Sequence, residues 1–333
     1  MTFSIYLWIF LASLFGALIG TPIIRKIALK FNIVDLPSGR KIHLEPIPLL
    51  GGFVIAIVFL LVFSLFSKPS GEIIAVILSS ILIILVGLID DIRGFPPFLK
   101  LSFQILATWL IIIFGTSISF TNNPNIDIPF TFLWVVGITN AFNLLDNMDG
   151  LSVGIAGIAS FFFFVLSAIG GQYLVGSLSI ALCGSCLGFL RYNFKPAKIF
   201  MGDTGSMFIG FILSIIGIKL RFSDDISFSW IIPIIILGIP IFDTTLVTIS
   251  RMMRKAKVSE AAKDHTSHRL VAFGLTHIKA VLLLYTIGII LGLLSILLAN
   301  FRIGYFIIPV FIIFFIGGII FFETKEKESF KQA

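Results

Sequence analysis

The feature that most constrains this chain is a series of apolar stretches, each about 20 residues long, that recur along its whole length. A helix of that length crosses a bilayer, and in lipid only helices and closed barrels satisfy every backbone hydrogen bond. Charged residues make up only 12% of the chain, against roughly 25% in soluble domains. The sequence therefore predicts an all-α, polytopic transmembrane helical bundle, with 1–333 as a single integral membrane domain.

Eleven stretches fit this description, which predicts about 11 spans. They are Phe3–Ile24, Leu49–Phe66, Ile73–Ile89, Leu101–Ser117, Ile128–Leu145, Leu151–Ile169, Tyr173–Leu190, Gly205–Leu220, Phe228–Ile249, Ala280–Leu298 and Ile303–Phe322. With the N-terminus outside and the C-terminus cytoplasmic, all but four of the 24 Lys and Arg residues face the cytoplasm, as the positive-inside rule requires. All 4 histidines lie on that side too. We therefore expect the active site on cytoplasmic loops 25–48, 90–100, 143–150, 191–204 and 250–279.

Adjacent carboxylates, Asp90 and Asp91, end the third apolar stretch. Two neighbouring carboxylates repel one another, which costs free energy unless a cation or a basic side chain neutralises their charge. A divalent metal would meet that need. The alternative is a solvated pair at the helix exit.

An Asn-rich motif, residues 140–150, ends the fifth stretch. Asn143 and Asp146 share a helix face, and Asp149 follows before Gly150 ends the helix. This strip of oxygen atoms suits a metal ion. Simple helix termination is the alternative, but it needs only one such residue.

A Gly-Asp-Thr-Gly-Ser turn, residues 202–206, follows Phe200 and leads into the eighth stretch. Its free backbone N–H groups and the helix dipole suit a phosphate, beside a carboxylate, Asp203, that suits Mg²⁺. An ordinary N-cap is the alternative.

The histidine block, residues 263–270, contains His265, His268 and Arg269. These side chains suit a diphosphate or a sugar, and a generic basic loop is the alternative. Lys41 and His43 also read as ordinary cations at the membrane surface. Asp243, deep in the ninth stretch, is expected to be functional or paired, because an unpaired buried acid is expensive.

The four motifs, in this order and on these loops, resemble the polyprenyl-phosphate N-acetylhexosamine-1-phosphate transferase family, whose relatives include the phospho-MurNAc-pentapeptide translocase. The resemblance runs from Asp35 to Leu275. Within the histidine block, His265 and His268 match the outer members of the family's His-x-His-His pattern, and Ser267 stands at the middle one. The segment from Asp35 to Gly52 looks like the GlcNAc-type transferases.

The resemblance implies catalytic roles for Asp90, Asp91 and Asp203, and a Mg²⁺ site, with Mn²⁺ as a substitute, at Asp203 and Asn143. For the Asp90–Asp91 pair we favour metal binding or positioning over proton removal, because a phosphomonoester is already mostly dianionic at neutral pH. The substrate-binding residues that it implies are Lys41, His43, Asp146, Asp149, Phe200, His265, His268 and Arg269.

The implied reaction transfers N-acetylhexosamine-1-phosphate from a UDP-sugar, first of all UDP-GlcNAc, to undecaprenyl or another polyprenyl phosphate, and releases UMP. It would be the first membrane step of a cell-surface polysaccharide, at the inner (plasma) membrane. The expected partners are these two substrates and membrane lipids but no nucleic acid, and a homodimer is left open. Two rivals are a secondary transporter with an ion-coupled site at Asp243 and a nonenzymatic assembly scaffold.

Overall fold

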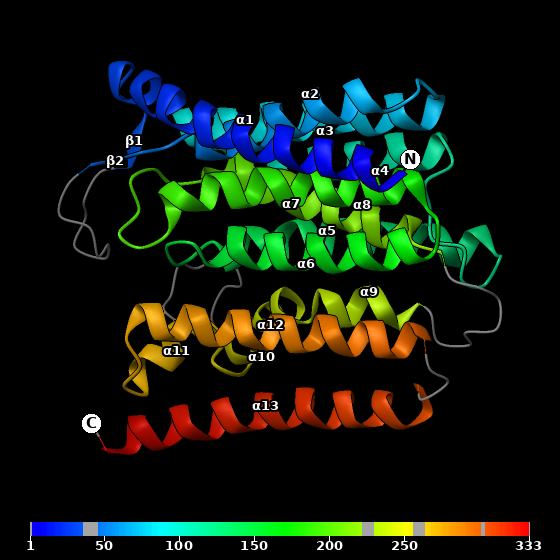
Figure 1. Cartoon of the computed structure of the whole chain (residues 1–333). Coiled ribbons are helices and arrows are strands. Elements are labelled where there is room, and N and C mark those ends of the chain that lie inside the picture. Colours follow the sequence, from blue (N-terminus) through cyan, green and yellow to red (C-terminus); the bar gives the residue numbers. More distant parts are fainter. Residues whose placement is uncertain (1, 36–45, 222–229, 256–263, 301–303, 333) are drawn as a thin grey trace. The chain divides into compact units, whose positions relative to one another are not determined.

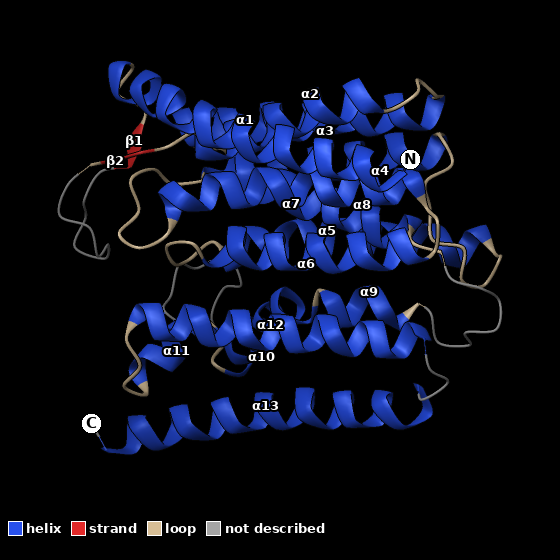
Figure 2. Ribbon diagram, in the orientation of Figure 1, coloured by secondary structure: helices blue, strands red, loops and turns tan. Residues whose placement is uncertain are grey.

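The computed structural model describes residues 2–35, 46–221, 230–255, 264–300 and 304–332 (Figure 1). These residues are helical almost throughout, apart from one short antiparallel pair of strands (Figure 2). The helices are α1 (Thr2–Lys30), α2 (Gly51–Phe66), α3 (Gly71–Arg93), α4 (Pro97–Ile113), α5 (Pro124–Leu145), α6 (Leu151–Ile169), α7 (Tyr173–Asn193), α8 (Gly202–Lys219), α9 (Ile231–Ile236), α10 (Gly238–Met253), α11 (Thr266–Ala272), α12 (His277–Asn300) and α13 (Gly304–Gln332), and the strands are β1 (Val34–Asp35) and β2 (Ile47–Pro48).

Seven helices in the described part of the chain are long and apolar enough to cross a membrane. They are Ser4–Lys30, Gly71–Arg93, Pro124–Leu145, Leu151–Ile169, Tyr173–Asn193, Gly202–Lys219 and His277–Ala299. Three shorter apolar helices are Gly51–Phe66, Pro97–Ile113 and Phe311–Thr324. The predicted all-α membrane protein is thus confirmed, whereas the count of about 11 spans and the sides of the termini stay predictions.

Each predicted span contains a helix, but the ninth is interrupted. One helix was expected over 228–249, and the structure instead has α9 and α10, which meet at Leu237. Pro240 lacks the N–H that would bond to the carbonyl of Ile236, and it lies in the first turn of α10, where that N–H is not needed. The chain makes a new start at Gly238.

The first compact unit, residues 1–221, is organised around α8. This helix packs against α2, α3, α5, α6 and α7, and nearly all its side chains are buried. At its start the backbones of α2 and α8 touch, because a Cβ added to Gly52 would lie 2.1 Å from the Cα of Gly205. The N–H groups of Gly51 and Gly52 donate to the carbonyls of Phe200 and Met201 at 2.9 and 2.8 Å. The Gly-Asp-Thr-Gly-Ser turn is therefore held from outside its own helix.

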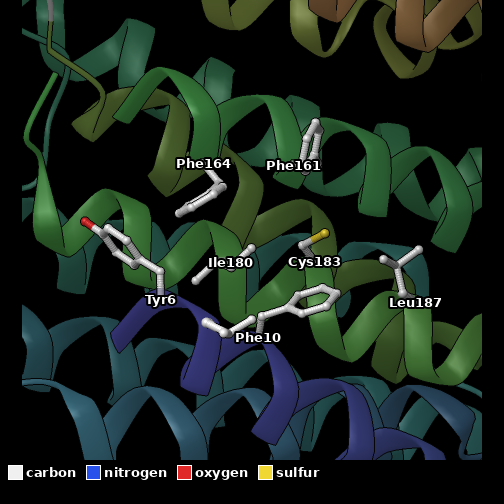
Figure 3. A pocket seen from close by; sticks show the side chains of 8 residues that line it. Tyr6, Phe10, Phe161, Phe164, Ile180, Cys183 and Leu187 are labelled. Atoms are coloured by element: carbon white, nitrogen blue, oxygen red, sulfur yellow. The ribbon is translucent and has the colours of Figure 1, made fainter. Parts of the chain in front are cut away.

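A cavity of about 320 Å³ lies among α1, α6 and α7 of the same unit (Figure 3). Its wall consists of aromatic and aliphatic side chains, among them Tyr6, Phe10, Phe164 and Leu187, and the thiol of Cys183 lies on it. No carboxylate, imidazole or basic group lines this cavity. It therefore offers nothing to a phosphate.

The second compact unit, residues 222–333, contains α9 to α13. Within it, α12 packs against α9, α10 and α11, and α13 packs against α10. This unit carries Asp243 and the histidine block, whereas the other three motifs belong to the first unit. The prediction of a single membrane domain stays a prediction.

Candidate functional site

Two carboxylates of the first unit converge on one positive charge. Asp90 lies near the C-terminal end of α3, Asp203 lies in the first turn of α8, and Lys100 lies in the first turn of α4. The Lys100 Nζ is 3.1 Å from Asp90 Oδ2 and 2.7 Å from Asp203 Oδ2. Residues more than 100 positions apart in sequence thus share a single cation. The predicted meeting of the Asp–Asp motif with the Gly-Asp-Thr-Gly-Ser turn is present.

Asp91 has a different task from Asp90. Its Oδ1 accepts the N–H of Asp203 at 2.7 Å, and its Oδ2 accepts the N–H of Thr204 at 3.1 Å and the Thr204 hydroxyl at 2.6 Å. Met201, the N-cap residue of α8, makes no side-chain cap of its own, so a carboxylate from α3 caps this helix instead. The negative charge also faces the positive end of the helix dipole.

The capped turn leaves no room for a side chain at Gly202. Its φ of 72° lies in the left-handed region, and a Cβ there would approach the Asp91 carboxylate oxygens to 2.6 Å. One part of the sequence interpretation was wrong. The N–H groups of Asp203 and Thr204, which it offered to a phosphate, donate to Asp91.

Asn143 brings the Asn-rich motif to the same place. It lies in the last turn of α5, and its amide Nδ2 donates to the hydroxyl of Ser206 on α8 at 3.0 Å. Its side chain also forms a hydrogen bond with Asp203. Because α5 and α8 pack along their length, the end of α5 is fixed against the start of α8. The two residues predicted to hold a metal are therefore in contact.

Asp146 and Asp149 add two further carboxyl groups to this end of the first unit. Burial, and then the charges of Asp203, Asp91 and Asp149, raise the pKa of Asp146 to about 8. Asp149 Oδ2 also accepts the N–H of Ala197 at 3.2 Å, which ties the Asn-rich motif to the segment that precedes Phe200. Asp146 therefore lies close enough to Asp203 and Asp91 for their charges to raise its pKa.

These residues fit a divalent cation. Two carboxylates already close on one ammonium group, and an amide lies in contact with one of them. Oxygen atoms of this kind are the ligands that Mg²⁺ prefers. Among the described residues, no three His, Cys, Asp or Glu side chains form a ready-made metal cage. Mg²⁺ commonly keeps several waters and binds through one or two carboxylates plus substrate phosphates, so it does not require such a cage.

The histidine block forms a network within the second unit. His265 is buried, and its Nδ1 lies 2.8 Å from Asp243 Oδ2. His268 is half-buried, and its ring centroid lies 6.3 Å from that of His265. Arg269 is buried and donates to the Ser250 hydroxyl at 2.7 Å. The expectation that Asp243 is paired is confirmed.

Two predicted residues, Lys41 and His43, lie outside the described part of the chain. Phe200 is half-buried, and its backbone is held by Pro48 and Gly51. Sequence reasoning did not single out Lys100, although a signal was available. It is a basic residue ten positions after Asp90 at the start of the next helix, and consecutive antiparallel helices bring such positions to the same end.

The comparisons with known proteins agree with this site. The model of the family described as "Glycosyl transferase family 4" matches residues 73–221, which contain the Asp–Asp motif, the Asn-rich motif and the Gly-Asp-Thr-Gly-Ser turn. A Bacillus subtilis (strain 168) protein named "Probable undecaprenyl-phosphate N-acetylglucosaminyl 1-phosphate transferase" is 40% identical over 319 residues, covering 92% of this chain and 88% of that protein. The chain belongs to glycosyl transferase family 4.

Two other relatives show the breadth of the family. A "Decaprenyl-phosphate N-acetylglucosaminephosphotransferase" of Mycolicibacterium smegmatis is 32% identical over 309 residues, covering 80% of this chain and 76% of that protein. A "Phospho-N-acetylmuramoyl-pentapeptide-transferase" of Prochlorococcus marinus is 35% identical over 242 residues, covering 65% of this chain and 67% of that protein. These relatives carry the names of transferases, and nothing in the comparisons supports the rival reading of a secondary transporter.

Proposed function

We propose that this membrane protein transfers N-acetylhexosamine-1-phosphate, most readily from UDP-GlcNAc, to undecaprenyl or another polyprenyl phosphate. The observation that carries the proposal is the convergence of Asp90 and Asp203 on Lys100, with Asn143 beside them. The names of the relatives supply the substrate class. The reaction would begin the membrane stage of a cell-surface polysaccharide.

The chemistry joins two anions. An oxygen of the polyprenyl phosphate attacks the sugar-side phosphorus of the UDP-sugar, a new diphosphate bond forms, and the bond to the bridging oxygen breaks so that UMP leaves. Repulsion between the two phosphates is the main obstacle, and such transfers rely on positioning and charge stabilisation. The Lys100 ammonium group supplies positive charge where Asp90 and Asp203 meet.

A Mg²⁺ ion held by Asp203 and Asn143, or Mn²⁺ in its place, would screen the diphosphate and stabilise the departing UMP. Asp90 has no need to act as a strong base, because the attacking phosphomonoester is already mostly dianionic at neutral pH. Its contact with Lys100 supports a positioning role. Asp91 holds the turn that carries Asp203.

Arg269 would provide a further cationic contact to the UDP-sugar, and His265 and His268 would add hydrogen bonds. The many basic residues of these loops support a site at the cytoplasmic face of the inner membrane, where a lipid-dissolved acceptor and a water-dissolved donor would meet. In this arrangement the N-terminus lies outside and the C-terminus in the cytoplasm.

The direct test is UMP release by purified protein from UDP-GlcNAc and polyprenyl phosphate, with and without Mg²⁺. We expect release only when both substrates and Mg²⁺ are present, and loss of release in Asp203→Asn. Asp127→Asn is the matched control, because Asp127 is equally an acid in a helix of the first unit, but the described hydrogen bonds of its side chain go to the segment 120–123 that directly precedes α5. Equal rates in the Asp203 variant and wild type would refute the proposal, and no UMP release from any UDP-sugar would favour the scaffold.

A further inference from the structure

Asp243 lies in the first half of α10, and both of its carboxylate oxygens are engaged by the start of the histidine block. Its Oδ2 lies 2.8 Å from His265 Nδ1, and its Oδ1 accepts the backbone N–H of Thr266 at 2.7 Å. The side chain of Asp243 is 2% exposed and that of His265 is 8% exposed. Burying a carboxylate this deeply costs free energy unless both of its oxygens form hydrogen bonds. Here the imidazole of His265 and the backbone N–H of Thr266 provide them.

In the described part of the same unit, the arginines pair with acids other than Asp243. Arg251 binds Asp264 through two hydrogen bonds of 2.9 Å, and Arg254 adds a third at 3.2 Å. Arg269 donates to the carbonyl of Asp264 and lies 3.3 Å from a Glu323 carboxylate oxygen. The described contacts therefore divide the acids between two tasks. Asp264 and Glu323 pair with the guanidinium groups, and Asp243 pairs with the imidazole.

The contact also selects one nitrogen of His265. An ionised carboxylate only accepts hydrogen bonds, so Nδ1 must carry the proton that lies between the two side chains. Nε2 is then the nitrogen that can face a ligand. Because Thr266 begins α11, the second contact of Asp243 holds the backbone on which His268 and Arg269 follow.

We infer that Asp243 is a positioning residue for nucleotide-sugar binding: it fixes the orientation and the tautomer of His265 and anchors the first turn of α11. The inference rests on the proposed function, in which the histidine block contacts the UDP-sugar. It gives Asp243 a role that does not involve ion transport. Carboxylates that orient a metal-ligating histidine in this way are worth about 10–100-fold in metal affinity or activity in other proteins.

Asp243→Asn separates the two contacts. The Asn oxygen can still accept the Thr266 N–H, but the Asn amide group then donates toward His265 Nδ1 and favours the opposite tautomer. We expect the KM for UDP-GlcNAc to rise about 10-fold with a smaller change in kcat. Asp127→Asn, which alters another buried carboxylate that accepts a backbone N–H at 3.0 Å, should leave both constants unchanged.

A double variant tests whether Asp243 acts through His265. If it does, Asp243→Asn combined with His265→Ala should be no more impaired than His265→Ala alone. Losses that multiply in the double variant would overturn the inference, as would a lower unfolding temperature of Asp243→Asn with an unchanged KM.

The tautomer can be observed without turnover. The chain has 4 histidines, so ¹⁵N-histidine labelling and the His265→Ala variant identify the signals of His265. We expect Nδ1–H in the wild type and a change of tautomer in Asp243→Asn, and an Nε2–H tautomer in the wild type would contradict the inference. If the wild type releases no UMP, the proposed function fails, while these spectra still decide whether Asp243 sets the state of His265.

Discussion

Replacing Asp91 by Asn should damage the protein in a way that replacing Asp90 by Asn does not. Asp91 accepts three hydrogen bonds from the first turn of α8, at 2.6 to 3.1 Å. An Asn oxygen can keep the bond to the Asp203 N–H, and the Thr204 hydroxyl can reorient. The Thr204 N–H, however, is left facing an amide donor in a residue that is 0% exposed.

A buried donor without an acceptor costs about 1–3 kcal/mol, and loss of a negative charge at the positive end of the helix dipole adds up to about 1 kcal/mol. We therefore expect Asp91→Asn to destabilise the first unit by about 1–4 kcal/mol and to displace Asp203. Thermal unfolding in detergent, with UMP release measured on the same samples, checks both effects. Asp90→Asn should lose activity at a nearly unchanged unfolding temperature, because Asp90 contacts the side chains of Asp203 and the partly exposed Lys100 and, in the described contacts, accepts none of the backbone N–H groups of α8. The reasoning is refuted if Asp91→Asn unfolds at the wild-type temperature, or if the two variants lose equal stability.

Three further predictions concern other contacts. Lys100→Met removes the positive charge between two carboxylates and should slow UMP release about 100-fold. Lys100→Arg keeps that charge and should be less impaired, so equal rates for the two variants would contradict this. Gly52→Ala places a Cβ 2.1 Å from the α8 backbone and should cost about 3 kcal/mol. Gly137→Ala, in the interior of α5 with nothing within 4 Å, should leave the stability unchanged or slightly raise it in the same unfolding assay. Burial alone would raise the pKa of Asp264, but the hydrogen bonds and charge of Arg251 outweigh it and hold that pKa below its usual value. The stability from this pair should therefore persist above about pH 4 and fall as the pH drops further, and Asp264→Asn should abolish that part of the acid loss in unfolding curves.

Much of the fold could be predicted from apolar length alone. A run of about 20 apolar residues has few options in lipid other than a helix, and a helix is present in every predicted span. The interruption between α9 and α10 was not predicted. Pro240 alone is not enough to predict it, because Pro22 and Pro129 lie inside the unbroken helices α1 and α5.

The sequence predicts which acidic residues form the site but not which partner each of them contacts. Adjacent aspartates point to a cation, yet nothing in the sequence says that the side chain of Asp90 meets Lys100 while that of Asp91 caps α8. Those tasks depend on how α3 packs against α8, which is a tertiary property. For Asp243 the cost of burying an acid predicted a partner, but only the structure identifies His265 as that partner.

The central claim is that Asp203 and its neighbours at one end of the first unit hold one divalent cation. Mn²⁺ titration of the purified protein, followed by the loss of the free-ion electron paramagnetic resonance signal, tests it most directly. We predict one Mn²⁺ site that tightens when UDP-GlcNAc is added, is lost in Asp203→Asn and is retained in Asp127→Asn. Undiminished Mn²⁺ binding by the Asp203 variant would contradict the account.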